Sequence, residues 1–95
     1  MKYEINPIDT SQITLPDDIL ALTEELARNI HEVWSAQRIE TGWIYGPKRD
    51  DVLKQHPNLV PYESLSEEDK DLDRFTAMET LKTIIKIGYT ISKNT

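Results

Sequence analysis

The chain has 95 residues, no cysteine and a formal net charge of −6. These totals exclude a disulfide-stabilised fold, a cysteine metal site and a strongly basic nucleic-acid binder. Hydrophobic residues make up 38% and charged residues 29% of the sequence, as in folded globular domains. No stretch approaches the ~20 apolar residues of a membrane span, and the N-terminus lacks the apolar core of a signal peptide. We therefore expect a single cytoplasmic domain over residues 1–95 that binds neither DNA nor membranes.

The two ends of the chain predict short extended pieces. Tyr3 and Ile5 alternate with polar residues, as in a strand, and Pro7 prevents a helix there. We expect Tyr3, Ile5 and Ile8 to anchor this N-terminal arm on the core, where large apolar side chains usually lie. Residues 89–91 predict a second extended piece that pairs with the arm.

Residues 16–41 predict the first long helix. Thr14 and Asp17 have the spacing of a capping box, and Pro16 suits a first helical turn. Apolar residues then recur every three or four positions, as on one face of a helix; they are Ile19, Leu22, Leu26, Ile30 and Val33. Gly42 is placed to end the helix in the left-handed conformation.

A second long helix is predicted to begin at Ser64 or Ser66, both of which have capping-box spacing, and to end at Gly88. Residues 63–73 hold six acidic residues against one lysine, which suits the positive end of a helix dipole. The calcium-loop pattern is missing from this segment. Together these elements predict a mainly α fold with minor β: a compact domain of two long helices, short helices and short terminal strands.

The segment between the two helices carries the unusual residues. Residues 38–62 hold two of the three glycines and three of the five prolines. Gly46 and Pro47 predict a turn. Asp50 and Asp51 are expected to open a short helix that closes before Pro57, and residues 59–62 a short extended piece. This segment reads as a functional loop carried on helices.

Polar and aromatic side chains on the last turns of the first helix are expected to face this loop. His31, Trp34 and Arg38 stand three and four positions apart, so their side chains share one face that leads to Trp43. A guanidinium can grip an anion bidentately, and an indole can stack on a planar ring. The structural alternative is that Trp34 belongs to the core and Arg38 pairs with the carboxylate of Asp50 or Asp51.

The loop itself interleaves aromatic residues with Lys and Arg, the combination that a nucleotide-like ligand needs for its base and phosphates. The alternative is a structural loop whose charged groups satisfy one another. For a ligand site we predict contact by Arg38, Trp43, Tyr45, Arg49 and Lys54, supported by His31, Trp34, Asp50, Asp51, His56 and Tyr62.

Enzymatic patterns are weak, so we expect no enzyme, no cofactor and no metal site. His31 and Glu32 lack the second histidine of a zinc-protease motif, because residue 35 is serine. The segment 42–48 lacks the spacing of a phosphate-binding loop. A hydrolase would need His31 or His56 within hydrogen-bond reach of a carboxylate in a cleft.

The segments HEVWSAQRIETGWIYGPKRDDVLKQHPNLVPYESL and ETLKTIIKIGYTI give the most specific signal. Over residues 15–91 the chain resembles a ryanodine-receptor repeat domain. The resemblance implies a mainly helical module with short strands. Such repeats occur as tandem pairs in giant calcium-release channels and as single-repeat proteins in bacteria and phages. With one repeat and no membrane segment, this chain is not expected to be a channel.

The resemblance also implies a ligand. One channel tandem carries an adenine-nucleotide site between its two repeats, with tryptophans around the base. Carried onto this sequence, that site corresponds to Trp43 with Tyr45, Arg38 and Arg49. A single repeat holds half of such a site, and a homodimer could restore the pair through two-fold symmetry.

Two functions therefore follow from the sequence. The first is a non-enzymatic ligand-binding or sensor module for a nucleotide-like anion. The alternative is a protein-interaction or self-association module that uses the same loop. A concave site lined by Trp43 and Arg38 would favour the ligand, whereas a flat exposed patch of Trp43 and Tyr45 would favour a protein partner.

Overall fold

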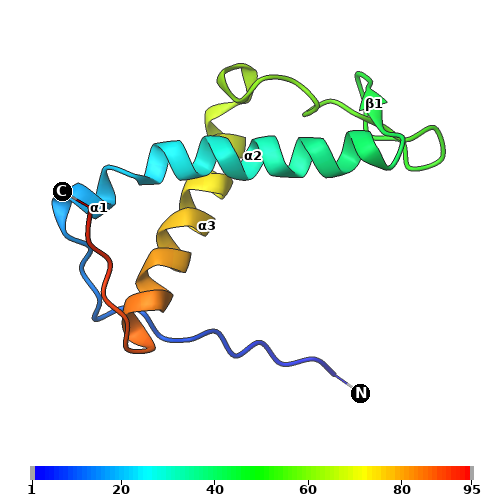
Figure 1. Ribbon diagram of the computed structural model, residues 1–95. Coiled ribbons are helices and arrows are strands. Elements are labelled where there is room, and N and C mark those ends of the chain that lie inside the picture. The colour runs from blue at the N-terminus through cyan, green and yellow to red at the C-terminus, as the bar shows by residue number, and fades with distance from the viewer. Residues whose placement is uncertain (1, 95) are drawn as a thin grey trace.

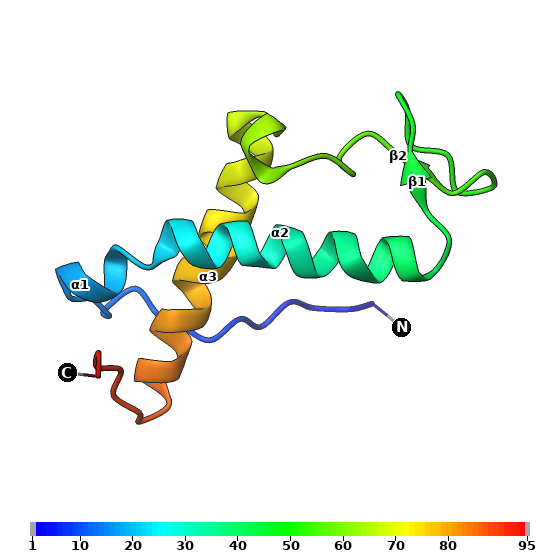
Figure 2. The same cartoon turned by 45° about the horizontal axis from the view of Figure 1, so that its top comes forward.

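The computed structural model describes residues 2–94 and is built on two long helices that cross each other (Figure 1). A short β-containing segment lies at the far end of the first long helix (Figure 2). In chain order the elements are α1 (Asp17–Leu20), α2 (Thr23–Glu40), β1 (Ile44–Tyr45), β2 (Gln55–His56), the 3-10 helix η1 (Tyr62–Ser64) and α3 (Glu67–Lys86). The prediction of a mainly α fold with minor β is confirmed.

The core consists of two small clusters around the helix crossing. Leu15, Ile19 and Leu81 form one, which Leu26, Met78, Ile85 and Ile91 complete. Ala27, Tyr62 and Leu65 form the other, with Val60 against it. Each long helix buries an alanine, Ala27 at 0% and Ala77 at 2% exposure. Small side chains at these positions leave room for other elements to pack closely against each helix.

The predicted single helix over 16–41 is two helices, separated by a turn at Ala21 and Leu22. The predicted cap at Thr14 is also wrong, since α1 has no side-chain cap and begins after Pro16. The buried residues of α2 are Thr23, Ala27 and His31, while Leu22 and Val33 are exposed. Because Tyr62 and Leu65 pack against Ala27, the small and polar face of α2 is covered and much of its apolar stripe stays open.

The start of α3 and the C-terminal ends of both long helices follow the predicted capping chemistry. At the start of α3, the Ser66 hydroxyl accepts a hydrogen bond of 3.1 Å from the Asp69 amide. Both helices end at glycines in the left-handed region, Gly42 at φ +96° and Gly88 at φ +110°. After α3, the amides of Gly88 and Tyr89 donate to the carbonyls of Ile85 and Ile84, which is the Schellman arrangement.

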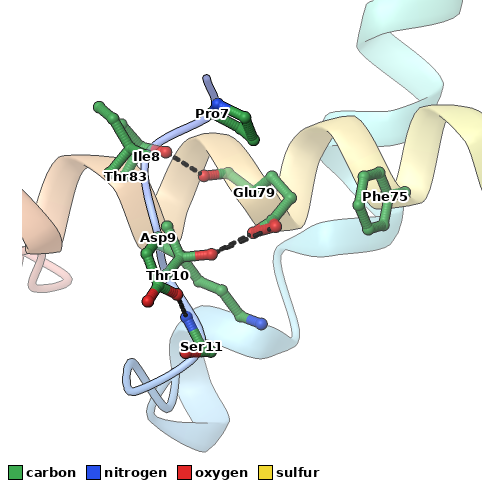
Figure 3. A pocket seen from close by; sticks show the side chains of 9 residues that line it. Pro7, Ile8, Asp9, Thr10, Ser11, Phe75, Glu79 and Thr83 are labelled. Atoms are coloured by element: carbon green, nitrogen blue, oxygen red, sulfur yellow. Dashed lines mark hydrogen bonds between the residues drawn. The ribbon is translucent and has the colours of Figure 1, made fainter. Parts of the chain in front are cut away.

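The prediction of short strands at the two ends of the chain is wrong. Within the described residues both ends are coil, and the N-terminal arm runs out past the helices (Figure 1). Tyr3 is 85% and Ile5 77% exposed, so these side chains do not anchor the arm. The anchor is Thr10, which is buried and whose hydroxyl donates to the Glu79 carboxylate at 2.8 Å (Figure 3). A polar bond therefore fixes the arm where we expected apolar burial.

An ionic network ties the helices together. The Arg74 side chain on α3 donates from Nε to Glu24 Oε2 on α2 at 2.7 Å, and from Nη1 to Glu67 and Asp71 on its own helix. The Tyr62 hydroxyl donates to the same Glu24 carboxylate at 3.0 Å. Glu24 thus connects α2, η1 and α3.

This network makes stability depend on pH. Hydrogen bonds from Arg74, and secondarily from Tyr62, lower the pKa of Glu24 from 4.5 to about 2. Because the pKa is lower in the folded state, the stabilisation is complete above pH 4.5 and is lost as the pH falls towards 2. Urea unfolding of the wild type and of Glu24→Gln should therefore differ most at neutral pH and converge in acid. Glu68→Gln is the control, and an equal pH profile for Glu24→Gln and wild type would refute the role of Glu24.

Candidate functional site

The segment between α2 and η1, residues 41–61, is here named the lobe. It begins in a Schellman turn, in which the amides of Gly42 and Trp43 donate to the carbonyls of Ile39 and Arg38. β1 then pairs with β2 in parallel, Ile44 opposite Gln55 and Tyr45 opposite His56. These bonds hold the lobe at the end of α2 (Figure 2).

The far end of the lobe is a turn where the sequence predicted a short helix at residues 50–54. The Asp50 carboxylate accepts hydrogen bonds from the amides of Val52 and Leu53 at 3.0 and 2.9 Å, so its side chain replaces the helical bonds. Lys54 adopts a positive φ of 54°, and its ammonium donates to the Thr41 carbonyl at 2.9 Å. Asp50 and Lys54 therefore hold the lobe in shape.

Four rings and one guanidinium meet where α2 joins the lobe. The Arg38 guanidinium carbon lies 4.8 Å from the ring centroid of Trp43 and 5.6 Å from that of Trp34. His31 stacks on Trp34 with centroids 5.6 Å apart, and His56 meets Trp34 edge-on at 4.9 Å. We name these five residues the aromatic cluster. It brings together residues that the sequence placed on one helix face and residues from the loop.

Arg38 is held by rings rather than by carboxylates. Among residues 2–94 it makes no ion pair with Asp50 or Asp51, although the sequence left that pairing open. Stacking of a guanidinium on indoles is a favourable cation–π contact. A hollow of about 560 Å³ lies beside it, lined by Trp34, Gln37, Arg38, Glu40 and Thr41. Trp43 does not line this hollow, and it contacts Arg38, which does.

The other predicted ligand-binding residues lie elsewhere. Tyr45 is 57% exposed. The Lys54 ammonium is hydrogen-bonded to the Thr41 carbonyl at the end of α2. Arg49 donates to Asp51 at 2.9 Å, and both side chains are more than half exposed. Tyr62, predicted to support the site, is a core residue at 1% exposure. Some charged groups of the loop are therefore paired within the protein: Lys54 with the Thr41 carbonyl, and Arg49 with Asp51.

The substitution Arg49→Ala measures how much the Arg49–Asp51 ion pair contributes to the free energy of unfolding. An exposed pair contributes about 0–1 kcal/mol, so this substitution should leave the free energy of unfolding within about 1 kcal/mol of wild type. Asp51→Ala is the matched control and should give the same value. Urea unfolding would contradict this assignment if Arg49→Ala alone cost about 2 kcal/mol or more, the cost of an orphaned buried charge.

Both histidines hydrogen-bond to backbone groups of the lobe. His56 is half-buried, and burial, followed by the charges of Arg49 and Arg38, lowers its pKa. Its Nδ1 accepts from the Asn58 amide at 3.0 Å, which requires the neutral ring. His31 Nε2 lies 2.7 Å from the Val60 carbonyl. Neither histidine is hydrogen-bonded to a carboxylate within the described chain.

One group of exposed residues escaped the sequence analysis. Large apolar side chains gather on the lobe and the end of α2; they are Ile39 (62%), Ile44 (58%), Tyr45 (57%), Val52 (91%) and Leu53 (62%). The available signal was an apolar pair, Val52 and Leu53, inside a turn-rich segment. The sequence predicts this pair to lie in a short helix, and that prediction carries no indication of its exposure.

The chain was also compared with known protein families. None of the helices within residues 2–94 is long and apolar enough to cross a lipid bilayer. The sequence profile of the RyR domain matches residues 3–93, nearly the whole chain. The match spans both long helices, the lobe and most of the two terminal coils. The chain belongs to the RyR domain family.

Proposed function

We propose that this domain is a non-enzymatic protein-interaction module that docks through the lobe. One observation carries the proposal: the accessible surface is 7575 Å² for a mass of 11.0 kDa. A folded monomer of this mass exposes about 5,600 Å² by the usual scaling. Burying this excess of about 2,000 Å² on each of two copies would give an interface of about 4,000 Å² in total, in the range of obligate homodimers.

The lobe is the part of this surface best suited to a partner. In sequence, Arg38 and Trp43 directly precede the exposed Ile39 and Ile44, and arginine and aromatic residues are the types that dominate interface energetics. Val52 at 91% exposure lies at the tip. An apolar patch with arginine and tryptophan at its edge supports docking of a protein surface.

We further propose that the first partner is a second copy of this chain. Two observations favour this choice: the excess area falls in the range of homodimer interfaces, and the resemblance to channel repeats implies tandem pairing. In a two-fold dimer each lobe would meet the same patch on its partner. The cytoplasmic location belongs to this proposal too, since a chain without cysteine needs no oxidising compartment.

Light scattering on the purified protein over a dilution series tests self-association. The wild type should have the mass of a dimer, and Val52→Asp with Leu53→Asp should have the mass of a monomer. Both positions are exposed, so the thermal midpoint of the monomer should fall only by the loss of the interface. Ile5→Asp, on the exposed arm, is the control. A wild-type monomer at every concentration, or equal dissociation by the control, would refute the dimer.

A nucleotide-like anion is the second candidate, favoured by the hollow beside Arg38. Within residues 2–94 that guanidinium has no hydrogen-bond partner, and 560 Å³ falls in the range of about 300–1,000 Å³ typical of small-molecule sites. A nucleotide at ~100 times its dissociation constant should stabilise the protein by about 2.7 kcal/mol. A thermal-shift screen with adenine and guanine nucleotides should give a shift that Arg38→Gln removes. A flat screen would refute this candidate.

A further inference from the structure

A second, smaller pocket lies on the other side of Trp34, between α2, the segment before α3, and α3 itself. Its volume is about 180 Å³. Polar atoms come from His31, Asn58, Asp69 and Asp73, and apolar walls from Trp34, Ile30 and neighbouring leucines. Neither the aromatic cluster nor the lobe explains why two carboxylates and a buried histidine line one small cavity.

Two carboxylates line the pocket, and the Ser66 hydroxyl donates to one of them, that of Asp69, at 3.0 Å. Asp69 and Asp73 are four positions apart on α3, so both lie on one face. Asp73 is half-buried, burial raises its pKa, and within residues 2–94 no hydrogen bond or ion pair reaches its carboxylate. The cations of the neighbouring turns are engaged: Arg74 with Glu24, Glu67 and Asp71, Lys70 with Glu67, and Arg28 with Glu63.

His31 adds an acceptor rather than a donor. Its ring is 4% exposed, and Nε2 lies 2.7 Å from the Val60 carbonyl. Two acceptors do not approach so closely, so Nε2 carries the proton and donates it to that carbonyl. Nδ1 has no partner among the described residues, and in the neutral tautomer it carries a lone pair. The polar side of the pocket is therefore rich in acceptors.

The size and the donor set restrict the ligand. A cavity of 180 Å³ is smaller than the ~300 Å³ of the smallest usual ligand sites, so it takes an end group rather than a whole nucleotide. In the described part of the chain, no three His, Asp or Glu side chains are placed to hold a metal ion. The complementary group is an organic cation that bears several N–H donors.

We propose that this pocket binds an alkylguanidinium or alkylammonium group, with Asp73 and Asp69 as its counter-charges and His31 Nδ1 as a further acceptor. A guanidinium can bind a carboxylate through two parallel hydrogen bonds, and its aliphatic stem can lie against Ile30 and Leu72. The group is either a small free cation or the end of an arginine or lysine side chain on a protein. This inference does not depend on self-association through the lobe.

Nuclear magnetic resonance titration of the full chain tests the proposal. The probes are ethylguanidinium for a free cation and N-acetylarginine amide for a protein side chain, with N-acetylcitrulline amide as the uncharged isostere. Both cations should shift the Trp34 indole and Asn58 amide signals saturably, and citrulline should not. Tighter binding of the arginine amide than of ethylguanidinium identifies a side chain as the ligand; equal binding identifies a free cation.

Matched variants distinguish binding in this pocket from nonspecific attraction of cations to an acidic protein. Asp73→Asn should weaken binding by about tenfold or more, because the cation loses its desolvated partner. Glu68→Gln makes the same charge change on an exposed site of α3 and should leave the affinity unchanged. Absence of saturable shifts, equal binding of citrulline, or equal loss in Glu68→Gln would overturn the proposal. So would nitrogen shifts showing His31 as an imidazolium at neutral pH, since the pocket would then neutralise itself.

Discussion

Tyr62→Ala is expected to lower the free energy of unfolding by about 3–5 kcal/mol, the usual cost of deleting a buried aromatic ring. Tyr62 is 1% exposed and is the largest fully buried side chain among the described residues. Its ring packs with Ala27 and Leu65, and the cations of Arg28 and Lys70 lie 5.4 and 5.5 Å from its centroid. A small domain has few such side chains, so this loss is a large part of its stability.

Urea unfolding followed by circular dichroism measures the effect. Tyr62→Phe is the matched control, because it keeps the ring and removes only the hydroxyl that donates to Glu24 at 3.0 Å. Glu24 is exposed to solvent and keeps its bonds to Arg74 in this variant, so Tyr62→Phe should cost clearly less than Tyr62→Ala. A cost below about 1 kcal/mol for Tyr62→Ala would show that the ring is not a core residue.

Gly46→Ala is expected to destabilise the lobe by about 1–3 kcal/mol, the range for overpacking. Gly46 is buried, and an added β-carbon would lie 2.5 Å from Gln55 Cβ, a group fixed to the backbone of β2. The Gly46 amide also donates to the His56 carbonyl at 3.3 Å. The two strands must therefore separate to accommodate the methyl group.

A double-mutant cycle isolates this contact. Gln55→Gly removes the β-carbon that the new methyl group meets, so Gly46→Ala should cost less in that background than in the wild type. Indole signals of Trp43 report the lobe, and urea unfolding reports the whole domain. Equal costs in both backgrounds would place the strain elsewhere.

The helices were predictable where local chemistry decides the structure. Ser66 caps α3 through the Asp69 amide as its spacing predicts, and Gly42 and Gly88 end the two long helices in the left-handed conformation. Capping depends on neighbours in sequence, so the sequence contains the whole signal. The aromatic cluster was predictable for a similar reason, because His31, Trp34 and Arg38 share a helix face.

The predictions that failed concern residues whose environment is decided by tertiary packing. Val33 fits the apolar stripe of α2 but is 50% exposed, because Tyr62 and Leu65 cover the face of Ala27 instead. Tyr3 and Ile5 alternate like a strand but find no partner strand in the described chain. The Lys54 ammonium donates to the Thr41 carbonyl, a contact that the spacing of these residues did not predict. Periodicity shows which residues could pack together, and only the fold decides which of them do.

The attachment of the lobe to the end of α2 has a consequence for hydrogen exchange. In the described chain Gly46 is the one buried residue of the lobe, so no apolar core of its own resists opening. Backbone bonds such as Ile44 to the Lys54 carbonyl can then break while the helix crossing stays folded, as in other locally opening segments. Amides of the lobe should exchange with solvent well before those of the crossing. Any partner that covers the lobe would register first as slower exchange at these few amides.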